Sequence, residues 1–295
     1  LGRWFDDVGQ HQKSFDSYEA ANAEVRASLK YAVETEARDY EIVRQHFDPV
    51  PESLPTPVPG DPAPIFIVGL PRSGKSTLEG ILARHPRVKA AGELRILGLL
   101  ARELSIRNGL SAPGSHISSV PPGELAAFAA QYMDFVRAVV PEPFVPIDTM
   151  PPNYRLIGLM RLALPNARIL HTVRDPLEQC AALYEKRFPH ETYEFTYDLA
   201  EIARFHGIYR DLVDYWRSAF PGFIHDIDVS GLGTDEPQLR AILAFCGQEW
   251  DALVRGDFRS GPRLGEAVSG PTNGAERLRL YESVLGPILS GRAGA

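Results

Sequence analysis

Short apolar runs alternate with stretches of helical periodicity over most of this chain. Residues 65–68 are all apolar and mostly β-branched, which is typical of a short buried strand. Similar runs predict further strands at residues 88–91, 144–147, 168–173 and 223–227. Apolar residues at steps near 3.6 predict helices at residues 77–84, 94–107, 123–139, 154–164, 177–188, 199–220, 238–246 and 275–289. This alternation predicts an α/β fold, in which helices cover both faces of a parallel sheet.

The first 48 residues follow a different, wholly helical pattern. Small and aromatic residues fall at the positions of a tetratricopeptide repeat, namely Leu1, Gly2, Phe5, Gly9, Ser14, Tyr18 and Ala21. Residues 1–48 are therefore either the last repeat of a truncated array or a plain helical hairpin that packs on the main domain. Seven prolines between Pro49 and Pro64 predict a stiff linker at residues 49–64. The main α/β domain is then expected to span residues 65–295.

Composition narrows the classes of partner. A net charge of −7 argues against a general binder of nucleic acid or of an anionic membrane surface. The two cysteines, Cys180 and Cys246, imply neither a disulfide framework nor a zinc site. No apolar run approaches the ~18 residues of a membrane span. We expect a cytoplasmic protein with a local basic pocket.

A phosphate-binding motif follows the first predicted strand. Its pattern, G-x-x-x-x-G-K-S, runs from Gly69 to Ser76 and opens the next predicted helix. Glycines let backbone N–H groups approach an anion, and the positive end of the helix dipole attracts it. Lys75 adds a point charge, and Arg72 adds a planar fork of donors. The flanking strand and helix favour an anion-binding loop over a chance turn, and the motif alone favours ATP or GTP.

Other short motifs follow the later predicted strands. In chain order, the motif segments are Pro71-Arg72-Ser73-Gly74, Gly92-Glu93-Leu94, Asp148-x-Met150-Pro151, Pro165-Asn166-Ala167-Arg168-Ile169 and Arg174-Asp175-Pro176. Together they resemble the sulfotransferases that use 3′-phosphoadenosine 5′-phosphosulfate (PAPS). The resemblance covers about residues 60–250 and is nearest to bacterial sulfotransferases with N-terminal tetratricopeptide repeats, which are related to tyrosylprotein sulfotransferases. It implies a P-loop NTPase-like fold, in agreement with the predicted sheet.

The resemblance also implies which residues bind the nucleotide. The loop that would hold the 5′-phosphosulfate consists of Arg72, Ser73, Gly74, Lys75, Ser76 and Thr77. Arg174 would pair with the 3′-phosphate, helped by Lys186, and Arg277 is the candidate basic residue that closes over the nucleotide. From the residues alone, Arg174-Asp175-Pro176 could also be a salt-bridged turn that caps a helix, which is the less favoured interpretation.

The resemblance implies a catalytic role for Glu93 as the general base, which takes the proton of the attacking hydroxyl. Arg72 and Lys75 would stabilise charge on the phosphosulfate. The product is adenosine 3′,5′-bisphosphate (PAP), and no metal is required. From the residues alone, Glu93 could instead be an acid favoured by a helix N-terminus.

Three positions depart from the family pattern. Thr149 stands where a lysine normally assists the leaving group, and we hypothesise that Lys75 supplies the missing cation. Ala182 replaces a serine that often bonds the 3′-phosphate, and loss of one neutral donor costs about 1 kcal/mol. Val229-Ser230 stands where Tyr-Glu is common, on the adenosine side of the pocket. These departures motivate an alternative, a non-catalytic member whose helical repeat binds protein partners.

A further alternative is a Mg²⁺-dependent P-loop kinase or NTPase. The segment Val145-Pro146-Ile147-Asp148 could act as a Walker B strand, and Mg²⁺ would then bridge Ser76 and Asp148. The Arg174-Asp175-Pro176 segment favours the sulfotransferase interpretation. We expect its acceptor to carry a hydroxyl, and a helical repeat would suit a peptide or protein acceptor or a protein partner.

Overall fold

The computed structural model describes residues 1–45, 54–57, 63–110, 119–189, 193–232, 234–254 and 274–290. The chain divides into two compact units. The first, called the sheet unit, comprises residues 39–173 and 212–264, and the second, called the helical unit, comprises residues 1–38, 174–211 and 265–295. The predicted linker, residues 49–64, lies for the most part outside the described residues, and the predicted domain boundaries stay a prediction.

The sheet unit is built on a five-stranded parallel sheet. Its strands are β1 (Ile65–Val68), β2 (Val88–Gly92), β3 (Val145–Asp148), β4 (Arg168–Val173) and β5 (Ile224–Asp228). The spatial order is β2-β3-β1-β4-β5, which places β1 in the centre. Each predicted strand is confirmed to within one residue at its ends. Because the strands are parallel, the segments after their carboxyl ends meet at one edge of the sheet.

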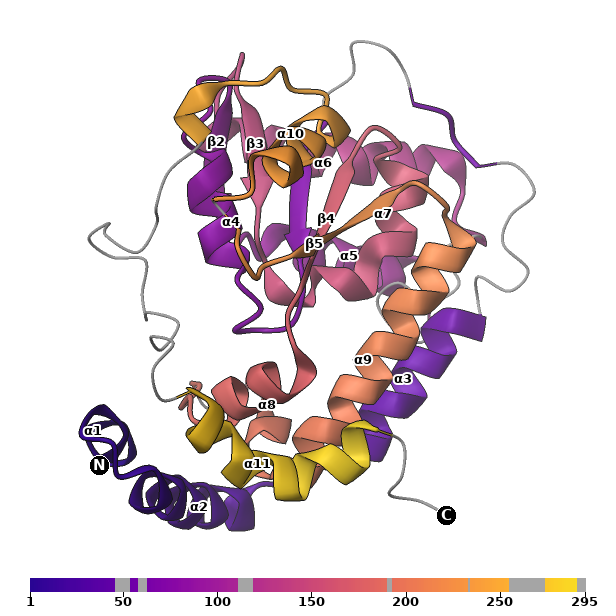
Figure 1. Ribbon diagram of the computed structural model, residues 1–295. Helices are drawn as coiled ribbons and strands as arrows, with labels where there is room; N and C mark the ends of the chain where they lie inside the picture. The colour runs from indigo at the N-terminus through magenta and orange to yellow at the C-terminus, as the bar shows by residue number, and fades with distance from the viewer. Residues whose placement is uncertain are drawn as a thin grey trace. The chain divides into compact units, whose positions relative to one another are not determined.

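Helices cover both faces of this sheet. The helices of the sheet unit are α4 (Lys75–Leu82), α5 (Ile96–Arg107), α6 (Pro122–Val139), α7 (Ile157–Ala163) and α10 (Glu236–Phe245), with 3-10 turns η2 (Pro151–Leu156) and η4 (Ala252–Val254). Side chains of β1 alternate between the faces. Ile65 and Ile67 pack with residues of α4 and α10, which lie on the viewer's side in Figure 1. Phe66 points the other way and stacks on Tyr132 of α6, with ring centroids 5.5 Å apart. The α/β fold predicted from periodicity is therefore confirmed.

The helical unit joins the N-terminal helices to later parts of the chain. It contains α1 (Gly2–Asp7), α2 (His11–Ser28), α8 (Pro176–Tyr184), η3 (Glu194–Tyr197) and α11 (Gly274–Leu289), and it shares α3 (Val33–Gln45) and α9 (Leu199–Ala219) with the sheet unit. The buried amide of Asn22 donates a 2.8 Å hydrogen bond to the Tyr184 carbonyl at the end of α8. Arg26 pairs with both carboxylate oxygens of Glu201. The helical character of the N-terminal segment is confirmed, and its assignment as a tetratricopeptide repeat stays a prediction.

Helix α8 is shorter than its periodicity predicts. It ends at Tyr184, whereas the apolar spacing predicts helix to residue 188. Pro189 disfavours helical backbone at the residue before it, so the last predicted turn does not form. Lys186 therefore lies beyond the helix.

The turn after β1 leaves no room for a side chain at Gly69. A Cβ at this position would lie 2.6 Å from Thr172 Oγ1 and 2.7 Å from Ser73 Oγ. The φ of Gly69 is also positive, at 151°, which few other residues adopt. The close approach of the loop to β4 therefore depends on a glycine.

Gly69→Ala should destabilise the sheet unit, because the new methyl group must displace Thr172 or Ser73. We expect the free energy of unfolding to fall by about 1–3 kcal/mol, measured by urea denaturation. Gly98→Ala in α5 is the matched control, since nothing lies within 4 Å of a Cβ there. That control should raise stability by up to ~1 kcal/mol, and equal effects of the two substitutions would contradict the argument.

Candidate functional site

The loop between β1 and α4 has the backbone shape of an anion-binding turn. Gly74 occupies the N-cap position of α4 with φ 89°, and no side chain caps this helix end. Arg72 also adopts a left-handed backbone, with φ 67°, which is uncommon for a residue other than glycine. The uncapped N–H groups and the helix dipole together favour a negatively charged ligand.

The hydroxyl of Ser73 ties this loop to the neighbouring strand. Ser73 is fully buried, and its Oγ lies 2.6 Å from Thr172 Oγ1 in β4. The Ser73 N–H donates to the Leu70 carbonyl. Ser73, predicted to contact the phosphosulfate, thus has both its hydroxyl and its N–H in contacts that hold the loop closed. Ser76 is exposed and Thr77 half-buried at the start of α4.

Lys75 is a buried cation inside the loop. Its side chain is 6% exposed, and Nζ donates a 2.8 Å hydrogen bond to the Leu70 carbonyl. Burial lowers the pKa of Lys75 to about 7, while the negative charge of Glu93 acts in the opposite direction. The charge of Glu93 thus acts on Lys75, although these two residues, both predicted to take part in catalysis, are 18 positions apart in sequence.

Glu93 follows β2 directly and is exposed. The peptide before it is held from two sides. The Gly92 N–H donates to Glu79 Oε1 at 3.1 Å, and the Gly92 carbonyl accepts from the Thr149 N–H at 3.0 Å. Sequence reasoning missed Glu79, although its place four residues after Lys75, on the same face of α4, was available as a signal.

Asp148, at the end of β3, is buried in a polar arrangement. Its carboxylate accepts a 3.1 Å hydrogen bond from the Tyr132 hydroxyl and a 2.9 Å bond from the Met150 N–H. Burial raises the pKa of Asp148 to about 6, although these two hydrogen bonds act to lower it. Both oxygens of the carboxylate therefore accept hydrogen bonds from residues of the sheet unit.

Arg174 and Asp175 open α8 in the helical unit. The Asp175 side chain accepts the Glu178 N–H at 3.0 Å and so caps the helix, and Pro176 takes its first position. The Arg174 Nε donates to Glu178 Oε2 at 3.2 Å. The salt-bridged cap considered from sequence is present, and the predicted contact of Arg174 with a 3′-phosphate stays a prediction.

Arg277 of α11 is engaged within the helical unit. Its guanidinium donates to both carboxylate oxygens of Glu185, at 2.8 and 2.5 Å, and the Tyr281 hydroxyl donates to the same carboxylate. Asp6 Oδ2 lies 3.8 Å from the same guanidinium. For Arg277 to reach a nucleotide, this network would have to open.

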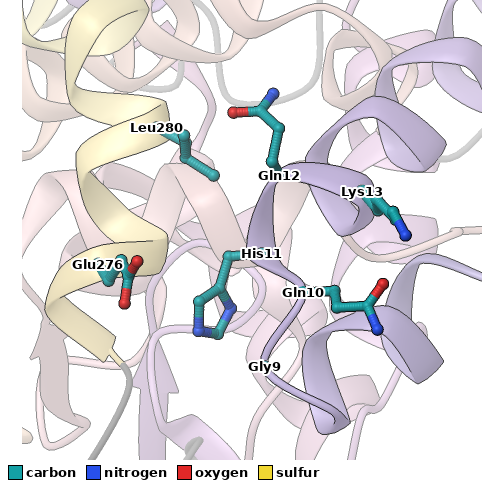
Figure 2. A pocket seen from close by; sticks show the side chains of 7 residues that line it. All are labelled: Gly9, Gln10, His11, Gln12, Lys13, Glu276 and Leu280. Carbon is teal, nitrogen blue, oxygen red and sulfur yellow. The ribbon is translucent and has the colours of Figure 1, made fainter.

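A separate hollow of about 550 Å³ lies in the helical unit, between the α1–α2 corner and α11 (Figure 2). It is lined by Gly9, Gln10, His11, Gln12, Lys13, Glu276 and Leu280. The Nδ1 of the buried His11 side chain donates a 2.7 Å hydrogen bond to Asp6 Oδ1. None of the predicted site residues lines this hollow.

The comparisons with known proteins identify the family. The model of the sulfotransferase family matches residues 64–252. The chain belongs to the sulfotransferase family. In this sulfotransferase-family chain, the matched region begins one residue before β1 and includes the loop between β1 and α4, Glu93 and Arg174.

One relative of this sulfotransferase-family chain is a much longer protein, and two solved sulfotransferase domains are of more similar length. An uncharacterized protein of Aquifex aeolicus is 30% identical over 242 residues, which are 77% of this chain and 32% of that protein. The chain thus spans about a third of the length of that relative. The sulfotransferase domain of the curacin biosynthetic pathway has a TM-score of 0.47 at 16% identity, covering 68% of this chain and 81% of that one. The sulfotransferase domain of the Synechococcus PCC 7002 olefin synthase has a TM-score of 0.46 at 21% identity, covering 69% and 82%.

The described residues also bear on membranes and metals. No helix in the described ranges is both long enough and apolar enough to cross a bilayer. Among the same residues, histidine, cysteine, aspartate and glutamate form no cluster of three that could hold a metal ion.

The buried Asp148 makes stability depend on pH with a defined sign. Because its pKa is raised in the folded state, folding binds a proton between pH ~4 and ~6, and stability falls as the pH rises through this window. Asp148→Asn is neutral throughout. Its stability relative to the native chain should therefore rise by on the order of 2–3 kcal/mol from pH 4 to pH 7, measured by denaturant titration.

Asp226→Asn provides a contrast of opposite sign. Although burial opposes it, hydrogen bonds from His171 and Arg217 lower the pKa of Asp226 to about 2. The stability that this carboxylate contributes is present above its unfolded pKa and is lost as the pH falls toward 2. Parallel pH curves for the two variants would contradict both assignments.

Proposed function

We propose that this chain is a PAPS-dependent sulfotransferase that acts on a hydroxyl acceptor. The observation that carries the proposal is the juxtaposition in the sheet unit of an uncapped helix end, a buried lysine inside its loop and a glutamate after β2. An anion-binding loop with a cation and a carboxylate base suits transfer between a phosphosulfate and a hydroxyl. Membership of the sulfotransferase family supports the same reaction.

The residues of the loop fit the phosphosulfate end of PAPS. Left-handed backbone at Arg72 and Gly74 turns the loop around the space ahead of α4, where a side chain cap is missing. Backbone N–H groups, the Ser76 and Thr77 hydroxyls and the guanidinium of Arg72 would hold the anion. PAPS supplies a sulfuryl group on a phosphate leaving group.

Glu93 acts as the general base in this proposal. The acceptor oxygen forms a bond to sulfur as its proton passes to Glu93, and the bond from sulfur to the bridging oxygen breaks. Negative charge then grows on the bridging oxygen. The Lys75 ammonium and Arg72 stabilise that charge, and PAP leaves. A nearby anion raises the pKa of a lysine, so the bound nucleotide would keep Lys75 protonated.

Two positions that depart from the family pattern, Thr149 and Val229, lie near the loop that carries Lys75 or near the turn before Glu93. Thr149 is buried and donates its N–H to Gly92, so it supplies no cation to the site. Val229, after β5, lies against the loop, because a Cβ at Gly74 would be 3.0 Å from its Cγ1. The proposal assigns the role of the absent family lysine to Lys75.

The 3′-phosphate is assigned to Arg174 with help from Lys186, through charge-assisted hydrogen bonds. Arg174 is paired with Glu178 in the helical unit, so binding would exchange a carboxylate for a phosphate. Ala182 is nearly buried and offers no hydroxyl. Arg277 enters this assignment only if its ion pair with Glu185 opens. The proposal also includes a peptide or protein acceptor and a protein partner for the N-terminal helices.

The kinase alternative has less support from the geometry. It requires Asp148 to ligate Mg²⁺, whereas both oxygens of that carboxylate accept hydrogen bonds from Tyr132 and Met150. The deciding experiment measures PAP and ATP binding by calorimetry with and without Mg²⁺, and PAP release from PAPS with a panel of phenols, sugars and tyrosine peptides. PAP binding without metal and acceptor-dependent release support the proposal. Binding of ATP only with Mg²⁺, or PAP binding with no transfer to any acceptor, would overturn it.

Glu93→Gln should lower kcat at least ~100-fold, because the amide cannot take the acceptor proton. Its affinity for PAP should stay close to that of the native chain.

Lys75→Met should also lower kcat by ~100-fold or more, because the leaving oxygen loses its ammonium. The control is Glu103→Gln on the exposed face of α5, which should keep native turnover. Full transfer by the Lys75→Met variant would refute the substitution of Lys75 for the family lysine.

Arg174→Ala should weaken binding of the 3′-phosphate of the nucleotide without weakening binding of its 5′-phosphate. We expect PAP to bind ~10- to 100-fold more weakly, while 5′-AMP, which lacks the 3′-phosphate, binds with little change. Arg210→Ala is the matched control, since Arg210 is exposed and pairs only weakly with the adjacent Asp211 at 3.7 Å. Equal losses for PAP and 5′-AMP would show that Arg174 does not contact the 3′-phosphate.

A further inference from the structure

Helix α4 holds the backbone beside the proposed base. Glu79, in the second turn of α4, accepts the Gly92 N–H at 3.1 Å. On the other side, the Gly92 carbonyl accepts the Thr149 N–H that follows β3. Gly92 has a left-handed backbone, with φ 75°, and the pairing of β2 with β3 is irregular between Ala90 and Gly92. The pairing with β3 therefore holds Gly92 through its carbonyl, and Glu79 holds its N–H.

We propose that Glu79 is a positioning residue for Glu93. Its hydrogen bond fixes the left-handed turn at Gly92 and so directs the Glu93 side chain toward the anion-binding loop. The inference rests on the proposed function of Glu93 as the base. Glu79 contacts no substrate in this scheme and acts only through the backbone.

The same helix carries the cation of the site. Lys75 and Glu79 are four residues apart in α4, so they lie on one face of the helix, one turn from each other. Lys75 holds the loop through Leu70, and Glu79 holds the turn before Glu93. A rigid helix between these two contacts sets the spacing of cation and base more precisely than two independent loops could.

The charge of Glu79 is unfavourable where it lies, which argues against a purely stabilising role. Burial raises the pKa of Glu79, and the hydrogen bond from Gly92 lowers it. The carboxylates of Glu93 and Asp148 raise it further. A carboxylate among two others weakens folding by mutual repulsion. The hydrogen bond from the Gly92 N–H, which partly compensates this cost, is the contact that orients the residue before Glu93.

The test compares Glu79→Ala with Glu79→Gln in the full chain. The alanine variant removes the acceptor for the Gly92 N–H, and kcat should fall at least ~10-fold, while KM for PAPS changes by less than about twofold. The glutamine variant keeps a carbonyl oxygen that can accept the N–H, and it should recover kcat to within about threefold of native. Glu103→Ala on α5 is the control for loss of a helix carboxylate.

Amide hydrogen exchange supplies a readout that does not depend on activity. Peptides that cover residues 88–94 should exchange faster in Glu79→Ala than in the native chain, and at the native rate in Glu79→Gln. A kcat of Glu79→Ala equal to that of the Glu103→Ala control overturns the proposal. So does a glutamine variant as slow as the alanine variant, since the hydrogen bond would then not be the cause.

The failure of the proposed function has a different signature. A native chain that binds PAP but transfers sulfate to no acceptor overturns the assignment of Glu93 and, with it, the catalytic part of this inference. In that case, an amide exchange rate in Glu79→Ala equal to the native rate would show in addition that the hydrogen bond from Gly92 to Glu79 does not hold this turn. Faster exchange together with a native kcat in an active enzyme would overturn the positioning role alone.

Discussion

The burial of one ammonium group is the constraint on which the site depends. Moving a cation out of water costs several kcal/mol unless acceptors or opposite charges replace the solvent. At Lys75 the Leu70 carbonyl and the field of Glu93 offset part of this cost, and the pKa still falls to about 7. The residues around Lys75 therefore offset only part of the free-energy cost of burying its ammonium group. An anion at the end of α4 would supply the missing negative charge.

The loop can enclose that ammonium because its backbone is held close to β4. Gly69 leaves no space for a side chain, and Ser73 bonds to Thr172 of the neighbouring strand. Gly74 then turns into α4 without a side chain cap, so the helix end remains available to a ligand. Close packing of loop on strand thus produces the open polar helix terminus that phosphate chemistry needs.

Family membership and the local chemistry of the site both favour sulfuryl transfer. They differ in the position of the lysine that would stabilise the leaving group. The family places a lysine after the aspartate that ends β3, whereas Thr149 here is buried and bonds to Gly92. The proposed mechanism assigns the cation to Lys75 at the start of α4, the helix that also carries Glu79, which accepts the Gly92 N–H after β2. In that proposal, the positions of the cation and of the base are set by one rigid element, because α4 carries Lys75 and Glu79 four residues apart.

The sequence by itself determined the strands, most helices and the glycine-containing turn between β1 and α4, because these follow from periodicity and spacing within a few residues. The likeness of short motifs to a family also singled out Glu93 and Arg174 as candidate site residues. Tertiary structure alone decided that Ser73 turns toward Thr172, that Glu79 holds Gly92, and that Arg277 pairs with Glu185. These partners are far apart in the chain. Such contacts depend on how strands and helices pack, which no local pattern of apolar and polar residues encodes.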